Sequence, residues 1–302
     1  MSALRETCFL CNSMDRITQE HVFPKWLQNR YELWNQQIVL KNGTRIPYRN
    51  LTIPCCEECN GTYLSQIENA VRHGVETNDI SELESISDSL FIWLYKIMYG
   101  IRYKEMFLPN DRANPEAGRI VDPNTLAAHD SYTIFPLFAK GMVAFDGFTP
   151  YSLFVFKIQR RDKIKNFYAS EPYKMWVAIL LNDIGIVASF QDDGYIAKDV
   201  ANASVLQGQT LLTISQFADF ASYVLFLKAR MVMLPNYLVS TDGTKYVFRI
   251  QTPLPNPLYR HEKEALLISY TRTLFGPLFE DHLVCLEDGS REIRYTSPFK
   301  YF

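Results

Sequence analysis

The chain has 302 residues, of which 47% are hydrophobic, and a formal net charge of −2. This balance excludes a protein that coats nucleic acid over its whole surface, so any contact with DNA has to be local. No stretch approaches the roughly eighteen continuous apolar residues of a membrane span, and the N-terminus lacks a hydrophobic signal core. The sequence therefore predicts a globular protein of about two domains in the cytoplasm.

Two Cys-x-x-Cys pairs stand near the N-terminus, Cys8 with Cys11 and Cys56 with Cys59. Such a pair turns two thiolates toward one point, and two pairs complete the tetrahedral shell that Zn²⁺ prefers. Cys55 is an alternative third ligand, but Cys56 has the regular spacing to Cys59. With no position left open, this zinc is expected to be structural. Cysteines used in this way fit a reducing compartment better than a disulfide framework does.

Between the two cysteine pairs the chain carries Glu20-His21, with Pro24 shortly after. Hydrolysis of a phosphodiester needs a deprotonated water molecule and stabilisation of negative charge on the transition state. A neutral imidazole can take the proton, and carboxylate and amide oxygens suit Mg²⁺ or Mn²⁺. Neighbouring residues of a strand point to opposite faces, so Glu20 and His21 serve one site only where the strand ends or bends. Pro24 favours such an end.

The next elements are a helix and a hairpin. Residues 24–34 have the apolar spacing of a short helix. Asn42-Gly43, between residues 37–41 and 44–48, predicts a β-hairpin. Three basic side chains on and after the hairpin are candidate contacts with a DNA backbone, and a solvated edge strand explains them equally well. These residues are Lys41, Arg45 and Arg49.

From Gly61 the pattern becomes helical. Asn60, just before it, offers an amide oxygen, and Glu68, about two helical turns further on, is a weaker candidate for a further metal contact. The polar segment 73–79 then predicts a domain boundary, which separates residues 1–76 from residues 77–302.

Over about residues 5–72 the chain resembles the HNH endonucleases of the ββα-metal superfamily, in the form stapled by a four-cysteine zinc. The motifs that carry the resemblance are Cys8-x2-Cys11, Glu20-His21, Pro24, Asn50-Leu51 and Cys56-x2-Cys59-Asn60. The resemblance implies that His21 is the general base and that Asn50 fixes the loop. It also implies that Glu20 and Asn60 bind a catalytic Mg²⁺ or Mn²⁺. The implied activity is metal-dependent hydrolysis of phosphodiester bonds in DNA.

Glu20 departs from the family pattern, which more often has Asp or His at that position. The departure favours an alternative of another class, a catalytically inactive zinc-dependent module that binds nucleic acid or protein. Cleavage of a plasmid in the presence of Mg²⁺ or Mn²⁺ separates the two hypotheses.

Residues 77–302 predict a mixed α+β domain, which makes the whole chain α+β. Ser81 with Glu84 predicts a helix cap. The further expected elements are a helix over 86–105, a loop over 109–132, strands between 133 and 195, a helix over 215–231 capped by Ser215, a strand over 246–250 and a helix over 262–274.

The same part of the chain concentrates five cations between residues 157 and 165, with Phe167 and Tyr168 close by. A solvated loop is the favoured explanation, and contact with nucleic acid is the alternative. We expect residues 77–302 to bind a regulatory ligand or a partner protein that controls the nuclease, as in host-defence or mobile-element systems.

Overall fold

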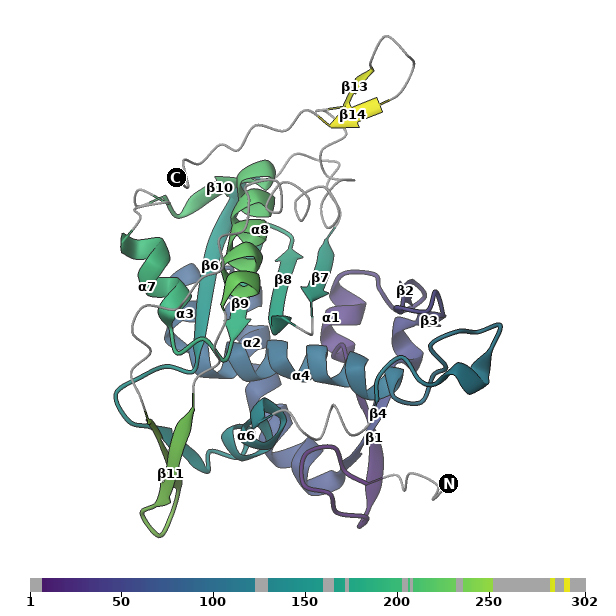
Figure 1. The fold of residues 1–302 in the computed structure, drawn as a ribbon, viewed down its shortest axis with the longest axis vertical. Helices are drawn as coiled ribbons and strands as arrows, with labels where there is room; N and C mark the ends of the chain where they lie inside the picture. The colour runs from purple at the N-terminus through teal and green to yellow at the C-terminus, as the bar shows by residue number, and fades with distance from the viewer. Residues whose placement is uncertain are drawn as a thin grey trace. The chain divides into compact units, whose positions relative to one another are not determined.

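The computed structural model describes residues 7–122, 130–159, 166–171, 174–202, 206, 209–231, 236–251, 283–285 and 291–293. Its helices and sheets make this an α+β protein, as the sequence predicts (Figure 1). In this described part of the chain, no helix has the length and apolar character needed to cross a membrane. The helix expected over 262–274 and the cations at 160–165 lie outside the described residues.

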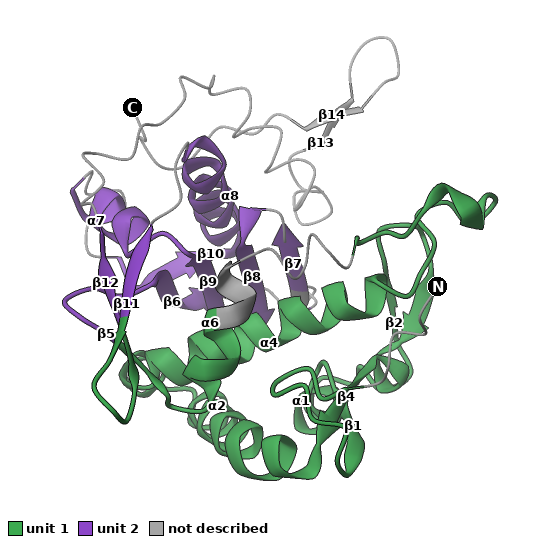
Figure 2. Cartoon of the chain, turned by 60° about the horizontal axis from the view of Figure 1, so that its bottom comes forward, with its two compact units in different colours: residues 1–144, 240–247 green, residues 145–239, 248–302 purple. Residues whose placement is uncertain are grey.

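The chain divides into two compact units (Figure 2). Unit 1 consists of Met1–Ala144 and Ser240–Val247, and unit 2 of Phe145–Val239 and Phe248–Phe302. The division therefore falls at 144/145, whereas the sequence predicts a boundary at 76/77, which lies at the end of a helix.

The reason for the later division is the helix α4 (Ser87–Glu105). It packs on α2 (Ser65–Thr77) and on β4 (Thr52–Cys56), so its apolar side chains complete the N-terminal core. Trp93 of α4 stacks on Trp26, with 6.1 Å between the ring centroids. Residues 77–105 thus belong with the cysteine pairs rather than with the later domain.

Unit 1 begins with two antiparallel strand pairs. Strand β1 (Ile17–His21) pairs with β4, so that Glu20 lies opposite Ile53. The segment between these strands leaves and returns at neighbouring points, because the Val22 amide donates to the Leu51 carbonyl at 3.0 Å. This segment contains α1 (Lys25–Arg30), β2 (Gln37–Val39), β3 (Arg45–Pro47) and the 3-10 helix Tyr48–Asn50.

The predicted hairpin is confirmed, because β2 and β3 pair antiparallel with Ile38 opposite Ile46. Gly43 in the turn has φ +78°, a backbone conformation that an L side chain rarely adopts. The Asn42 side chain accepts a hydrogen bond from the Thr44 amide at 3.0 Å. The Asn-Gly pair therefore forms the turn that the sequence predicts.

A series of helices follows β4. A π-helix (Cys59–Leu64) leads into α2, which is followed by α3 (Ile80–Ser85) and α4. The cap of α3 is Asp79, whose side chain accepts from the Ser81 amide, so Ser81 is not the N-cap that the sequence predicts. Val22 approaches α4 so closely that a Cβ on Gly100 would lie 2.7 Å from its Cγ2 atom.

Short helices follow α4 in the chain, and two further small sheets are formed by later strands. The 3-10 helix Pro115–Ala117 and α6 (Asp130–Ala139) interrupt the loop that the sequence predicts over 109–132. A three-stranded sheet has the order β11-β12-β5, and β13 pairs with β14. These strands are β5 (Val143–Phe145), β11 (Tyr237–Thr241), β12 (Tyr246–Ile250), β13 (Leu283–Cys285) and β14 (Arg291–Ile293).

Unit 2 is built on a five-stranded sheet of order β10-β6-β9-β8-β7. Its elements are β6 (Tyr151–Gln159), β7 (Phe167–Glu171), β8 (Trp176–Leu181), β9 (Ile184–Phe190), α7 (Tyr195–Asn202), β10 (Leu211–Thr213) and α8 (Ile214–Arg230). Strand β10 runs parallel to β6, and the other neighbours are antiparallel.

The helix α8 packs on this sheet and supplies much of its core. Phe217 and Phe220 are fully buried against Phe156 of β6. The helix begins with a capping box formed by Thr213 and Gln216, so the cap is Thr213 instead of Ser215. The central strand β9 and its neighbour β8 are buried along their whole length.

Candidate metal centre and the site around His21

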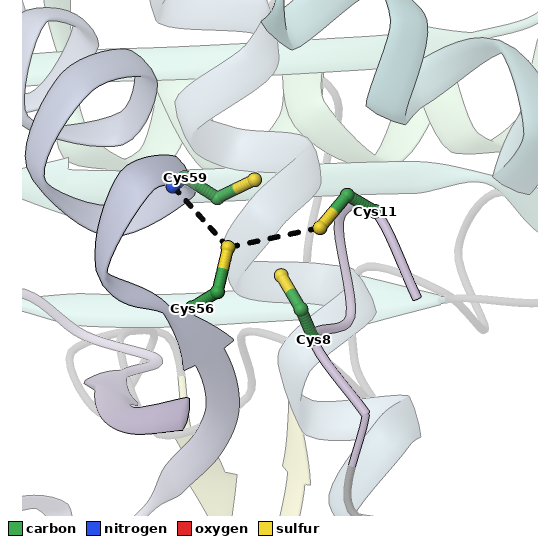
Figure 3. Close-up of side chains that lie close together, drawn as sticks. All are labelled: Cys8, Cys11, Cys56 and Cys59. Carbon is green, nitrogen blue, oxygen red and sulfur yellow. Dashed lines mark hydrogen bonds between the residues drawn. The ribbon is translucent and has the colours of Figure 1, made fainter. Parts of the chain in front are cut away.

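Four cysteine side chains converge on one point (Figure 3). The sulfur atoms of Cys8, Cys11, Cys56 and Cys59 all lie within 4.8 Å of one another. The Cys11 and Cys56 sulfurs are 3.7 Å apart, and a tetrahedral site with Zn–S bonds of about 2.3 Å has S–S edges of about 3.8 Å. The geometry therefore fits a structural Zn²⁺. Among the described residues, this is the only group of three or more Cys, His, Asp or Glu side chains placed to hold a metal.

Local backbone structure presents each pair of thiols. The first pair lies in a tight turn before β1, where the Asn12 amide donates to the Cys8 carbonyl at 2.8 Å. In the second pair, Cys56 ends β4 and Cys59 begins the π-helix, so that the Cys59 amide points at the Cys56 sulfur, 3.5 Å away. The pairing of β1 with β4 then brings the two turns together.

Cys55 lies outside this group of four. Its side chain is fully buried, and its sulfur lies 3.9 Å from the sulfur of Cys8, in hydrogen-bond contact. The choice of Cys56 over Cys55 thus agrees with the observed cluster. A thiol at this distance contacts a ligand of the proposed zinc without being one of the four.

His21 is the last residue of β1, so the strand ends where the sequence predicts. Its side chain is half-buried. Its ring stacks on Trp34, with 6.2 Å between centroids, and a hydrogen bond joins it to the backbone of Arg49. Burial lowers the pKa of His21, and the positive charge of Lys25 lowers it further, against an opposing effect of Glu20. The imidazole is therefore neutral near pH 7.

Glu20 is not exposed beside His21 but points into the interior of unit 1. Its side chain is 10% exposed, and its carboxylate pairs with the ammonium of Lys96. Lys96 also pairs with Glu68 and donates to the His21 carbonyl oxygen at 2.9 Å. The structure thus brings together two of the predicted metal ligands, but around a lysine that the sequence analysis did not select.

Asn60 lies on the same face of β1 as Glu20. Its amide nitrogen donates to Thr18 Oγ1 at 3.3 Å, and Thr18 and Glu20, two residues apart on a strand, share a face. His21 is on the other face of the strand. In the described part of the chain, no hydrogen bond joins the side chains of Glu20, His21 and Asn60 to one another.

Asn50 is exposed at the end of the 3-10 helix Tyr48–Asn50. The side chain that ties this loop to its neighbours is Arg49, which donates to the Trp34 carbonyl at 3.1 Å and also to Asn35. Arg49 thus ties this loop to the Trp34–Asn35 segment, and the loop-fixing role of Asn50 stays a prediction.

The other two basic residues of the predicted DNA contact differ from Arg49. Lys41 and Arg45 are exposed at the hairpin formed by β2 and β3. Their accessibility agrees both with contact to phosphate and with a solvated edge. Arg49 is half-buried, and its guanidinium already has partners.

Searches against protein-family models, curated proteins and solved structures find no match to this chain. The interpretation of the site therefore depends on its own geometry.

One feature of the sequence around Lys96 could have identified it as a buried, paired cation. It is a single cation inside the apolar run Phe91-Ile92-Trp93-Leu94-Tyr95, Lys96, Ile97-Met98, and a buried lysine requires an acidic partner.

Proposed function

We propose that unit 1 is an HNH-type endonuclease that hydrolyses phosphodiester bonds in DNA, with His21 as the general base. The proposal rests on one arrangement: β1 pairs with β4, a helix follows β4, and four cysteines suited to Zn²⁺ hold these elements together. A neutral histidine lies at the end of β1. This is the order of elements that the resemblance to the ββα-metal superfamily implies. Lys41 and Arg45 of the hairpin are the proposed contacts with the DNA backbone.

His21 has the properties that a general base needs. One ring nitrogen is hydrogen bonded to the Arg49 backbone, which orients the ring, and the other ring nitrogen can accept a proton from water. Lys25 is exposed, and its charge acts on the imidazole, so a phosphate beside His21 would meet a cation there.

The catalytic Mg²⁺ or Mn²⁺ that the resemblance implies at Glu20 and Asn60 does not fit these contacts. The Glu20 carboxylate is buried and already paired with the ammonium of Lys96, which would repel a divalent ion at the same oxygens. Asn60 donates to Thr18 through its amide nitrogen and not through the oxygen that would bind a metal, so the misfit lies at Glu20. The proposed mechanism therefore assigns no step to an ion at Glu20.

Replacement of His21 tests the proposal. In a plasmid-nicking assay with Mg²⁺ or Mn²⁺ present, His21→Ala should lower the cleavage rate by roughly 10²- to 10⁴-fold, while zinc content and thermal stability remain those of the wild type. His73→Ala is the matched control, because His73 is an exposed histidine of α2 in the same unit. Wild-type cleavage by His21→Ala would refute the assignment.

The pH dependence of cleavage supplies an independent check. A base works in its deprotonated form, so the rate should rise with pH and level off above the pKa of His21. Because burial lowers that pKa, the midpoint of the rise should lie below pH 6.5, the ordinary value for histidine. A rise centred well above that value would point to another base.

One observation favours a second candidate function, a zinc-dependent module that binds nucleic acid or protein without cleaving it. The pairing of Glu20 with Lys96 removes the carboxylate that the family uses for its metal. DNA binding in a gel-shift assay, with no nicking under any divalent ion, would support this candidate. Control of either activity by a ligand or partner protein bound to residues 77–302 stays a prediction.

A further inference from the structure

Lys96 occupies the middle of α4 and its side chain is 1% exposed. An ammonium group has three N–H donors, and the structure gives Lys96 three acceptors. They are the Glu20 carboxylate, the Glu68 carboxylate and the His21 carbonyl oxygen. The three donors of this cation therefore join α4, which carries the lysine, to acceptors on two other segments, β1 and α2.

The charges at this position are arranged around the lysine. Burial by itself lowers the pKa of Lys96, but Glu68 and Glu20 outweigh burial, so the net shift is upward and the ammonium stays charged. Burial raises the pKa of Glu68, and Lys96 opposes that rise. One buried ammonium thus neutralises part of the charge of two carboxylates that would otherwise repel each other.

The same two carboxylates are the hard oxygen ligands that a divalent ion prefers. They approach each other from β1 and α2 and meet on the Nζ atom. An ion between them would take the place of the ammonium or lie against it, and like charges in a buried position repel strongly. The position is therefore one at which a cation is required, and the chain supplies that cation itself.

We propose that Lys96 is the resident cation of the Glu20–Glu68 pair, that this pair binds no divalent ion while Lys96 is present, and that removing the ammonium converts the pair into a site for Mn²⁺ or Mg²⁺. The inference depends only on these contacts, and it stands whether or not the protein cleaves DNA.

The experiment measures binding of Mn²⁺ to zinc-loaded protein by electron paramagnetic resonance, so that no nuclease activity is needed. Wild type and Glu20→Gln should bind Mn²⁺ equally, because Glu20 holds no ion in the wild type and its replacement therefore removes no ligand. Lys96→Met keeps an unbranched side chain, one atom shorter, and removes its charge, and it should bind an additional Mn²⁺ per chain. The double variant Lys96→Met/Glu20→Gln should lose that additional ion.

Two results would overturn the proposal. The first is a Mn²⁺ ion bound by the wild type and lost in Glu20→Gln, since Glu20 would then be a metal ligand beside Lys96. The second is a folded Lys96→Met that binds no additional ion. Folding is checked by zinc content and circular dichroism, and if Lys96→Met does not fold, the comparison of wild type with Glu20→Gln decides alone. Failure of the nicking assay with His21→Ala would leave all these outcomes unchanged.

Discussion

Replacing one cysteine at a time distinguishes a zinc ligand from its immediate neighbour. Cys56→Ala removes one of four sulfurs that lie within 4.8 Å of one another, and Cys55→Ala removes an equally buried sulfur just outside the group. Structural zinc contributes about 10–16 kcal/mol in zinc-finger peptides, and the whole stability of a domain is about 5–15 kcal/mol. Loss of the metal should therefore unfold the β1–β4 module, and Cys55→Ala should cost only about 0.5–3 kcal/mol.

The assay is elemental analysis of freshly purified protein, followed by thermal unfolding of the same samples. Wild type and Cys55→Ala should each hold about one zinc per chain, and Cys56→Ala should hold much less and unfold at a lower temperature. Zinc retained in Cys56→Ala and lost from Cys55→Ala would transfer the ligand role to Cys55. Folded wild-type protein without zinc would refute the structural metal altogether.

Two further predictions concern the neighbouring elements. The double variant Lys41→Gln/Arg45→Gln should weaken DNA binding and lower the salt slope by about 2, because each lost phosphate contact lowers it by about 0.9, and an unchanged slope would identify the hairpin as a solvated edge. Gly100→Ala should lower the free energy of unfolding by about 1–3 kcal/mol through overpacking, because its Cβ would lie 2.7 Å from Val22. The control Gly61→Ala meets no atom within 4 Å, so a similar loss in both variants, measured by denaturant unfolding, would contradict the packing argument.

The features that the sequence predicts correctly depend on short, local patterns. Two Cys-x-x-Cys pairs each fix a turn, so their meeting in space needs only the pairing of β1 with β4. Asn42-Gly43 determines the hairpin, because Gly43 adopts the positive φ that the turn requires. The end of β1 at His21 follows in the same way from the proline three residues later.

The features that the sequence does not predict depend on distant contacts or on competition between neighbouring residues. Lys96 is separated from Glu20 by 76 positions in the chain, and no spacing rule connects them. The placement of α4 in unit 1 has the same origin, because its apolar residues fit two possible cores. The caps Asp79 and Thr213 each lie two positions before a serine that is also suited to capping, and a pattern of residue types does not distinguish them.

The closure between Val22 and Leu51 gives the segment from residue 23 to residue 50 a particular evolutionary freedom. The residues that flank it are joined by a backbone hydrogen bond of 3.0 Å from the Val22 amide to the Leu51 carbonyl, so the pairing of β1 with β4 does not depend on how many residues lie between them. Lengthening such a segment is inexpensive, because doubling a flexible loop adds only about 0.6 kcal/mol of closure entropy. Insertions at the tip of the β2–β3 hairpin, beyond Val39 and before Arg45, are thus the changes by which the chain can acquire a different binding surface while its cysteine-clamped frame stays the same.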